Sequence, residues 1–415
     1  MDDSRCFVIV GGGQAGGRAA EALRAAGFAG RIVLLAEEAH RPYERPPLSK
    51  GLLTGEAGGE AGGEAVFLRP DAYYAEQGIE VRAGCRVEAI DRAARRVVLA
   101  DGTPLAYDGL LLATGSRLRR LPLPGADLAG VHYLRGLDDS RALRAALTQA
   151  RRLVVVGGGY IGLEVAAAAR TCGVAVTVLE AADGLLRRQV AAPLGDWFAQ
   201  LHAAHGVDIV TGARVAAFEG GDRVTAVACE DGTAYSADAV VVGVGVVPDT
   251  ELAEAAGLDV NDGIVVDACG RTADPAIFAA GDVTRHPNDI LGRSLRLESW
   301  QNAELQAAAA ARTMAGTPTP YAQVPWFWTD QYDVNFQMIG LPDNADQWVW
   351  RGDPARDSAF SLFYLAGGRV VGANAVNKGK DIAPARKMIE TGARPDPEAL
   401  ADPETSLKKV LKAAG

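Results

Sequence analysis

The chain has 415 residues, of which 48% are hydrophobic and 23% charged, as in globular proteins of two or three domains. Its net charge of −10 argues against general binding to nucleic acids or membranes, and we expect neither a membrane span nor a signal peptide. The five cysteines are scattered without a C-x-x-C pair, which predicts a reducing cytoplasmic setting. We expect no metal site.

The first predicted strand is followed by a glycine turn and an alanine-rich helix, in the run CFVIVGGGQAGGRAAEAL (6–23). Gly11, Gly13 and Gly16 match the G-x-G-x-x-G pattern, in which glycines form a tight turn, admit a pyrophosphate and allow close helix–strand packing. A second predicted strand ends at Glu37, an acid placed to hydrogen-bond a ribose hydroxyl. One such motif is weak evidence, since glycine clusters often mean only a turn.

The next segment, RPYERPPLSKGLL (41–53), combines three prolines with charged residues and ends in an apolar run. Each proline fixes its own φ and disfavours helix in the residue before it, so we expect an extended segment that turns into a helix near Ser49. A proline-stiffened surface loop is the alternative. The Gly- and Glu-rich stretch 54–65 that follows is interpreted as a mobile surface loop without a site role.

The same plan recurs later in the chain, in RLVVVGGGYIGLEVAAAA (152–169). Gly157, Gly159 and Gly162 repeat the glycine spacing 146 positions after the first copy, and the following strand again ends in an acid, Glu180. Two copies, each with an acid at the expected distance, favour tandem dinucleotide-binding units over a pair of ordinary turns.

Both copies continue into alternating strands and close on an apolar strand that ends in glycine, at Gly115 and Gly245. The run AAGDV (279–283) adds Asp282, an acid placed to bind a ribitol hydroxyl. We therefore assign the first copy to a flavin and the second to a nicotinamide that delivers hydride, the usual logic of two such units. Taken alone, AAGDV and LLATGS (111–116) are equally compatible with plain αβ turns.

Several segments together resemble the FAD-containing, NADH-dependent ferredoxin reductases of bacterial oxygenase systems, of the putidaredoxin reductase and biphenyl and toluene dioxygenase reductase type. These segments, which span nearly the whole chain, are RPYERPPLSK, GGGYIGLEVAAAARTCGV, GRTADPAIFAAGDV, RLESWQNAELQ and PWFWTDQY. The resemblance implies an α/β fold with two tandem Rossmann-like, glutathione reductase-like domains and a C-terminal α+β domain. Its expected boundaries are 1–115 with 246–321 for FAD, 116–245 for NADH, and 322–415 for the C-terminal domain.

The C-terminal domain is expected to be an antiparallel sheet with helices. The run SAFSLFYLAGGRVVGANAV (358–376) predicts two strands joined at Gly367-Gly368, and a last helix is expected near Thr405.

The resemblance also implies how FAD is held. Arg45 would face the FAD phosphates, Pro47 would pack near the isoalloxazine ring, and Lys50 would place its ammonium near flavin N5, favouring the anionic reduced form. The expected FAD-binding residues are Gly11, Gly13, Ala15, Gly16, Glu37, Arg45, Pro47, Lys50, Val87, Thr114, Gly115, Arg135, Gly281, Asp282 and Trp300.

For NADH, the resemblance places Glu164 and Glu298 around the nicotinamide carboxamide, although an acid favoured by the helix dipole is the alternative for Glu164. Glu180 would accept from the adenine-ribose hydroxyls and repel a 2′-phosphate, an inference that the nearby Arg187 and Arg188 weaken. The expected NADH-binding residues are Gly157, Gly159, Tyr160, Ile161, Gly162, Glu164, Glu180, Arg187, Arg188 and Gly245. The expected catalytic residues are Lys50, Glu164, Glu298 and Trp328.

No cysteine stands between Cys6 and Cys85, so the redox disulfide of related flavoproteins is missing and the flavin must deliver electrons directly. By resemblance Trp328 lies beside the isoalloxazine, whereas Trp326 is equally compatible with a core role. We predict that NADH reduces FAD, which passes single electrons to a [2Fe–2S] ferredoxin serving a cytochrome P450 or a Rieske dioxygenase. A rubredoxin reductase and a non-catalytic, redox-sensing flavoprotein of the apoptosis-inducing-factor type are the alternatives.

Docking of an acidic ferredoxin on a chain of net charge −10 requires a local basic patch. Ordinary solvated helix charge is the alternative for any one residue. The candidates are Lys378, Lys380, Arg386, Lys387, Lys408 and Lys409.

Overall fold

The computed structural model describes residues 4–56 and 64–414, so most of the Gly- and Glu-rich stretch lies outside the described residues. The chain divides into two compact units, which are described separately. The first comprises Met1–Glu44, Val66–Arg117 and Val247–Phe327, and the second comprises Arg45–Ala65, Leu118–Val246 and Trp328–Gly415.

The first unit is built on a parallel sheet in the strand order β19-β7-β1-β2-β3. β1 pairs with β2 on one side and β7 on the other, and its last four residues are buried, as expected for a central strand covered on both faces. The strands are β1 (Cys6–Val10), β2 (Arg31–Leu35), β3 (Ile79–Arg82), β7 (Gly109–Leu112) and β19 (Ile277–Ala279).

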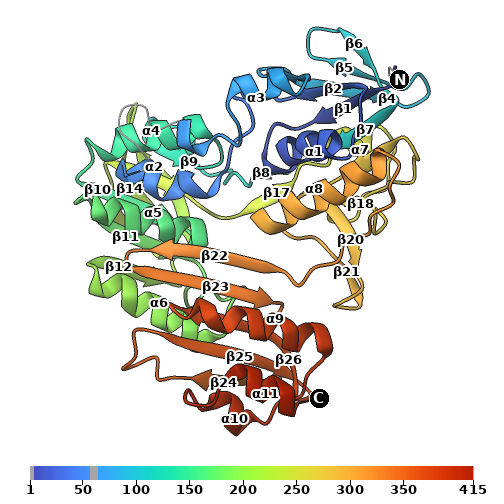
Figure 1. Cartoon of the computed structure of the whole chain (residues 1–415). Coiled ribbons are helices and arrows are strands. Elements are labelled where there is room, and N and C mark those ends of the chain that lie inside the picture. The colour runs from blue at the N-terminus through green and yellow to red at the C-terminus, as the bar shows by residue number, and fades with distance from the viewer. Residues whose placement is uncertain (1–3, 57–63, 415) are drawn as a thin grey trace. The chain divides into compact units, whose positions relative to one another are not determined.

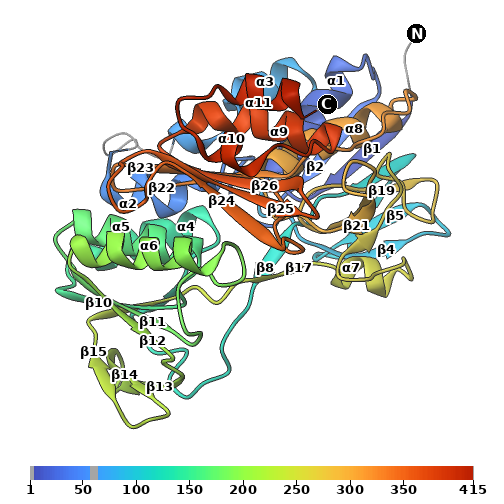
Figure 2. The same ribbon diagram turned by 90° about the horizontal axis from the view of Figure 1, so that it is seen from below.

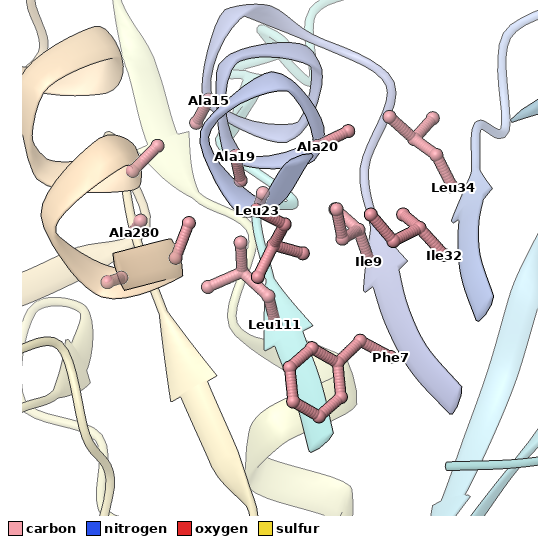
Figure 3. Close-up of a cluster of buried hydrophobic side chains, with 14 of the residues drawn as sticks. Phe7, Ile9, Ala15, Ala19, Ala20, Leu23, Ile32, Leu34, Leu111 and Ala280 are labelled. Carbon is pink, nitrogen blue, oxygen red and sulfur yellow. The ribbon is translucent and has the colours of Figure 1, made fainter. Parts of the chain in front are cut away.

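Two helices lie side by side in this unit, α1 (Gln14–Ala25) and α8 (Trp300–Met314) (Figure 1). Their alanines let the helices approach closely, and side chains of α1 such as Leu23 pack on Ile9 and Leu111 of the sheet (Figure 3). Leu23 and Ile9 are fully buried, which is worth about 2–3 kcal/mol for each such side chain.

The remaining elements of the first unit are short. A small antiparallel sheet of β4, β5 and β6 follows the path expected from the alternating pattern after β3. These elements are α3 (Asp71–Glu76), β4 (Val87–Asp91), β5 (Arg96–Leu99), β6 (Pro104–Ala106), α7 (Glu251–Ala255), β18 (Ile264–Val265), β20 (Thr284–Asn288) and β21 (Arg293–Leu295). The short η2 (Glu64–Val66) spans a boundary between the two units. The chain crosses between the units within β8 (Ser116–Leu118) and β17 (Val246–Pro248).

The second unit repeats the parallel plan, with the strand order β12-β11-β10-β16-β9. α5 follows β10 as α1 follows β1, so the internal repeat seen in the sequence is a repeat of structure. The elements are β9 (Val131–Tyr133), α4 (Leu137–Leu147), β10 (Arg152–Val156), α5 (Tyr160–Thr171), β11 (Ala175–Glu180), α6 (Ala192–Ala204), β12 (Val207–Thr211), β13 (Val215–Gly220), β14 (Val224–Cys229), β15 (Ala234–Ser236) and β16 (Ala239–Val242).

The C-terminal part of the second unit is an antiparallel sheet in the order β22-β23-β26-β25-β24, with helices α9 to α11 on one face and α5 and α6 on the other (Figure 2). Phe198 of α6 packs edge-on against Phe336 of the sheet. The elements are β22 (Trp326–Gln331), β23 (Val334–Gly340), β24 (Gln347–Arg351), β25 (Phe360–Ala366), β26 (Arg369–Val376), η3 (Gly379–Asp381), α9 (Ile382–Thr391), α10 (Pro397–Ala401) and α11 (Leu407–Ala413).

The predicted hairpin at Gly367-Gly368 is confirmed, because β25 and β26 pair antiparallel across these two glycines. Both have positive φ, +54° and +78°, which is the requirement of a two-residue turn that continues the strand twist. The proline-rich segment forms η1 (Pro46–Ser49) and α2 (Gly51–Thr54), so the helix predicted near Ser49 is also confirmed.

Candidate functional site

The first glycine turn, in the first unit, leaves no room for side chains at two of its glycines. Gly11 has a φ of +120°, and a Cβ added there would stand 2.1 Å from the carbonyl oxygen of Ala113. A Cβ on Gly16 would stand 1.9 Å from the carbonyl oxygen of Gly11, so the helix packs directly on the turn. At Gly13, the N-cap of α1, an added Cβ would meet nothing within 4 Å, which leaves the backbone of the helix N-terminus open to a ligand.

The turn after β19 lies against the same helix. Gly281 has a φ of +87°, and its Cβ would lie 3.0 Å from the side chain of Ala15. The side chain of Gln306, on α8, accepts hydrogen bonds from the Gly281 amide at 2.8 Å and from Thr284 at 2.9 Å. Gln306 was not among the expected site residues, although it closes the RLESWQNAELQ segment.

Other residues expected at the flavin are spread over this unit. Asp282 accepts a hydrogen bond from Ser116 at 3.4 Å, and the hydroxyl of Thr114 donates to the backbone of Asp249 at 2.7 Å. Glu37 forms an ion pair with Arg86 at 3.1 Å and its side chain is 63% exposed. Gly115, Val87 in β4 and Trp300 at the first position of α8 also belong to the first unit.

Glu298, just before α8, is paired with Arg296, which also lies 3.2 Å from Asp262. Its side chain is 41% exposed, whereas that of Arg296 is 15% exposed. Arg296 therefore anchors the Glu298 carboxylate from the protein side. The sequence places Arg296 two residues before Glu298, on the same side of an extended segment, and that spacing is the signal that could have identified it.

The second glycine turn repeats the first in detail. Gly157 has a φ of +109°, and its Cβ would stand 2.5 Å from a backbone oxygen of Gly243. A Cβ on Gly162 would stand 2.2 Å from the Gly157 oxygen, whereas Gly159 is open. Tyr160 and Ile161 begin α5, and Ile161 is 46% exposed although it is large and apolar, which fits a surface that a ligand covers.

Glu180 is fixed at this second turn by the backbone. One oxygen of its carboxylate accepts from the Gly158 amide at 2.7 Å and the other from the Ala182 amide at 2.7 Å. Each oxygen retains a further lone pair for a ribose hydroxyl. Gly245, which follows β16 in the same unit, has a φ of +97°.

Arg187, expected near the adenine ribose, is occupied by neighbouring carboxylates. Its guanidinium lies 3.1 Å from Asp183 and 2.9 Å from Asp196. Arg188 is exposed. Two carboxylates therefore neutralise the charge of Arg187, which could otherwise have attracted the 2′-phosphate of NADPH.

The second unit also brings together a charged pair from distant parts of the sequence. Lys50 Nζ lies 2.7 Å from Glu164 Oε1, and the side chains are 20% and 2% exposed. Ser49 and Thr329 both donate hydroxyl hydrogen bonds to the same carboxylate, Thr329 at 2.5 Å. A carboxylate buried this deeply is stabilised by these three donors together.

Ser49 and Thr329 were not predicted. Ser49 adjoins Lys50, so it could have been found by its place in the PPLSK run. Thr329 and Gln331 alternate with Trp328 along β22 and are buried, 0% and 1% exposed, so strand alternation places them on the face opposite Trp328.

Further residues expected at FAD also lie in this unit. Arg45 Nη1 donates to the Arg135 backbone oxygen at 2.5 Å, and Pro47 is part of η1. Arg45, Pro47, Lys50 and Arg135, all expected at FAD, thus belong to the second unit, whereas the first glycine turn belongs to the first.

Two features of the glycine turns fit a bound dinucleotide. The helix N-termini at Gly13 and Gly159 are open, and the other glycines of each motif leave no room for a Cβ. Among residues 4–56 and 64–414, no group of three or more His, Cys, Asp or Glu side chains is placed to hold a metal ion. Within the same residues, every helix is too short or too polar to cross a membrane.

Comparison with known proteins agrees with this geometry. Residues 6–307 match the pyridine nucleotide-disulphide oxidoreductase family, and residues 326–411 match the reductase C-terminal family. The chain therefore belongs to the pyridine nucleotide-disulphide oxidoreductase family. The predicted fold class and the predicted membership are confirmed.

The chain is also similar over nearly its whole length to individual members of this family. The chain is 50% identical over 406 residues to the ferredoxin–NAD(+) reductase component of the anthranilate 1,2-dioxygenase system of Burkholderia cepacia, covering 98% of this chain and 99% of the relative. It is 42% identical over 407 residues to the corresponding biphenyl dioxygenase component of Paraburkholderia xenovorans (strain LB400), covering 98% of each. The crystal structure of the covalent putidaredoxin reductase–putidaredoxin complex matches with a TM-score of 0.94 and 41% identity, covering 99% of each chain.

Proposed function

We propose that the chain is an FAD-dependent NADH:ferredoxin reductase of a bacterial oxygenase system. The observation that carries this proposal is the buried Lys50–Glu164 pair at the start of α5, beside an open glycine turn of dinucleotide type. The named activities of the relatives, each matched over nearly its whole length, support ferredoxin as the acceptor. The acceptor oxygenase would be of the Rieske or the cytochrome P450 kind.

FAD, when bound, supplies the chemistry of accepting a hydride and releasing single electrons. The first glycine turn would hold its pyrophosphate at the N-terminus of α1, with Glu37 and Asp282 on its hydroxyls. We propose residues 1–115 and 246–321 as the FAD domain, and Arg45, Pro47, Lys50, Arg135 and Trp328 as further FAD-binding residues.

Residues 116–245 would bind NADH at the second glycine turn. Glu180, held by the Gly158 and Ala182 amides, would receive the adenine-ribose hydroxyls. Glu164 and Glu298 would orient the nicotinamide carboxamide, and Lys50 would hold its positive charge next to the hydride acceptor. The role of the protein is thus to orient both reactants and to keep one cation in place.

A direct test is stopped-flow reduction of the bound flavin by NADH. Lys50→Ala should retain FAD but slow flavin reduction by about 100- to 1,000-fold, the usual effect of losing one electrostatic stabiliser. Lys50→Arg is the matched control, because it retains the charge. An unchanged rate in Lys50→Ala would remove Lys50 from the site.

The acceptor is tested with purified ferredoxins and rubredoxins coupled to cytochrome c reduction. Turnover with a [2Fe–2S] ferredoxin supports the proposal. Turnover with rubredoxin alone would favour a rubredoxin reductase, and bleaching by NADH without turnover with any carrier or ferricyanide would favour a redox-sensing flavoprotein. We also propose a cytoplasmic location, which is supported by the five cysteines, all of them free in the described structure.

The docking surface is proposed to include α11. Lys408 and Lys409 are exposed there, and α11 packs against α9, where Lys387 is already paired with Glu390 at 3.3 Å. Arg386 lies within α9, Lys378 and Lys380 shortly precede it, and all three would extend the patch. Replacing Lys408 and Lys409 by Glu should raise the apparent KM for ferredoxin and leave ferricyanide reduction normal, with a larger difference at low salt. Equal loss with both acceptors would contradict a docking role.

A further inference from the structure

A line of buried polar side chains leads away from Glu164 within the second unit. Thr329 Oγ1 lies 2.5 Å from Glu164 Oε1, and Gln331 Nε2 lies 3.2 Å from Thr329 Oγ1. His202 Nε2 lies 2.8 Å from Gln331 Oε1, and the Tyr332 hydroxyl lies 3.2 Å from His202 Nδ1. Thr329, Gln331 and His202 are at most 1% exposed, so their polar groups depend on one another rather than on water.

The direction of the first bonds follows from Lys50. Its ammonium can only donate, so Glu164 Oε1, 2.7 Å away, is an acceptor. Thr329 must therefore donate its single hydroxyl proton to Glu164. The lone pairs of Thr329 then accept from the amide NH₂ of Gln331, which fixes the amide orientation that distances alone would leave open.

The rest of the direction follows link by link. Gln331 presents its carbonyl oxygen to His202, so His202 donates from Nε2. With the ring neutral, Nδ1 is the acceptor for the Tyr332 hydroxyl. That pattern requires a neutral imidazole. Burial lowers the pKa of His202 to about 4, which agrees with the neutral form. The ring of His205 stacks on Tyr332, with centroids 3.6 Å apart, and holds the outer end of the chain.

We propose that Thr329, Gln331 and His202 are positioning residues, whose aligned O–H and N–H dipoles hold the Glu164 carboxylate turned toward Lys50. This inference rests on the proposed function, in which that pair acts on the nicotinamide and the flavin. Hydrogen bonds aligned in one direction polarise one another, so the outer links strengthen the inner one. The amide of Gln331 does not transfer protons readily, so the chain holds charge rather than conducting protons.

Other groups facing Glu164 are constant in this comparison. They are the Lys50 ammonium and the Ser49 hydroxyl from the proline-rich segment, and the buried Tyr160 on α5 itself. Thr329, from β22, is the contact that the variants change. None of the variants below changes Lys50, Ser49 or Tyr160. A change in the rate of flavin reduction by NADH is therefore attributed to the hydrogen-bonded chain from Thr329 to Tyr332.

The first experiment needs neither NADH nor a ferredoxin. Nitrogen NMR of the FAD-loaded protein labelled at its five histidines, with His202→Asn to assign the signal, reports which ring nitrogen of His202 carries the proton. We expect the neutral Nε2–H form from about pH 8 down to about pH 5. A neutral Nδ1–H form, or a protonated ring within this range, would overturn the direction of the chain.

The second experiment measures the rate of flavin reduction by NADH as a function of pH. Thr329→Val should lower the rate across the profile about tenfold, Gln331→Leu should lower it less, and Tyr332→Phe least, as expected for loss of hydrogen bonds ever farther from a charged group. Thr329→Ser retains the hydroxyl and should restore the wild-type profile, which a purely structural role of this side chain would not predict.

The outcomes separate this inference from the proposed function. Coincident profiles for Thr329→Val, Thr329→Ser and wild type would overturn the positioning role. If Gln331→Leu fails to fold, the Thr329 pair carries the test alone. If NADH does not reduce the protein but His202 is in the Nε2–H form, the proposed function is overturned, whereas the direction of the hydrogen-bonded chain is supported.

Discussion

The two strand–turn–helix repeats share a backbone and differ in charge at one equivalent position. Arg18 and Glu164 each stand two residues after the third glycine of their G-x-G-x-x-G motif, which is Gly16 in the first repeat and Gly162 in the second. Arg18 is 17% exposed and lies 3.1 Å from Glu21 and 3.6 Å from Glu44, whereas Glu164 is 2% exposed and holds Lys50. The same location on the helix thus carries a surface cation in one repeat and a buried anion in the other.

The difference teaches which features the glycine turn controls. In both repeats the first glycine of the motif abuts a backbone carbonyl and the third abuts the first, so backbone contacts leave those positions no choice of residue. Positions further along the helix face whatever packs on it, η1 and α2 in the case of α5. Backbone shape is therefore repeated, and chemistry is set by the segment packed against it.

The largest expected effect comes from breaking one turn. Gly11→Ala would place a Cβ 2.1 Å from the Ala113 oxygen at a φ of +120°. Overpacking and backbone strain each cost about 1–3 kcal/mol, so we expect loss of FAD and a marked fall in the thermal midpoint. Flavin content and thermal denaturation measure both.

Gly13→Ala is the matched control within the same motif. Its Cβ would meet nothing within 4 Å of protein and its φ is −87°, so the stability of the apoprotein should change little. Weaker FAD binding by a stable Gly13→Ala protein would separate ligand approach from turn geometry. Equal loss of apoprotein stability in both variants would contradict the distinction.

Removing the two charges tests the contrast between the repeats directly. Glu164→Ala leaves the Lys50 charge without its partner, and breaking such a buried pair costs about 3 kcal/mol. Arg18→Ala removes a partly exposed cation and should cost about 0–1 kcal/mol. Urea denaturation followed by tryptophan fluorescence compares them, and similar costs would show that Glu164 is not specially stabilised.

Most features that depend on local backbone geometry could be predicted from the sequence. Gly11, Gly16, Gly157 and Gly162 lie where their spacing places them, and the hairpin at 367–368 follows from its glycines, because these features depend on local geometry. Local patterns do not report which distant segments meet.

The polar chain shows that limit clearly. Glu164, His202 and Thr329 belong to α5, α6 and β22, and their meeting depends on how two sheets pack on shared helices. The short-range signals were present, as in the alternation of Thr329 and Gln331, but nothing in a single sequence states what they face.

Acid sensitivity is a property in which the two units should agree. Burial lowers the pKa of His202, in the second unit, and of His286, in the first, to about 4. Unfolded histidine titrates near pH 6.5, so the unfolded chain binds more protons between about pH 6.5 and about pH 4, and stability falls as pH falls through this window. Above it, neither histidine contributes.

His286→Gln removes one titrating group. Between about pH 7 and about pH 5 the loss of stability should shrink by about 2 kcal/mol compared with wild type. Denaturant titrations at the two pH values decide, and an unaltered loss in His286→Gln would contradict a neutral buried His286.

The acids that close the second strand of each repeat differ in how they are held. Glu180 is fixed by the Gly158 and Ala182 amides at 2.7 Å, whereas Glu37 pairs with Arg86 and is 63% exposed. A preorganised carboxylate discriminates better between a ribose hydroxyl and a 2′-phosphate, because it does not swing away from the phosphate.

We therefore expect Glu180→Ala to lower the preference for NADH over NADPH about tenfold, the effect of one hydrogen bond to a charged group. The preference should narrow without reversing, because Arg187 is held by Asp183 and Asp196 and is not available to bind the extra phosphate. Glu37→Ala should leave the ratio unchanged and weaken FAD binding instead. Ratios of kcat/KM for the two nucleotides provide the measurement, and a wild-type protein that already prefers NADPH would show that the ribose assignment of Glu180 is wrong.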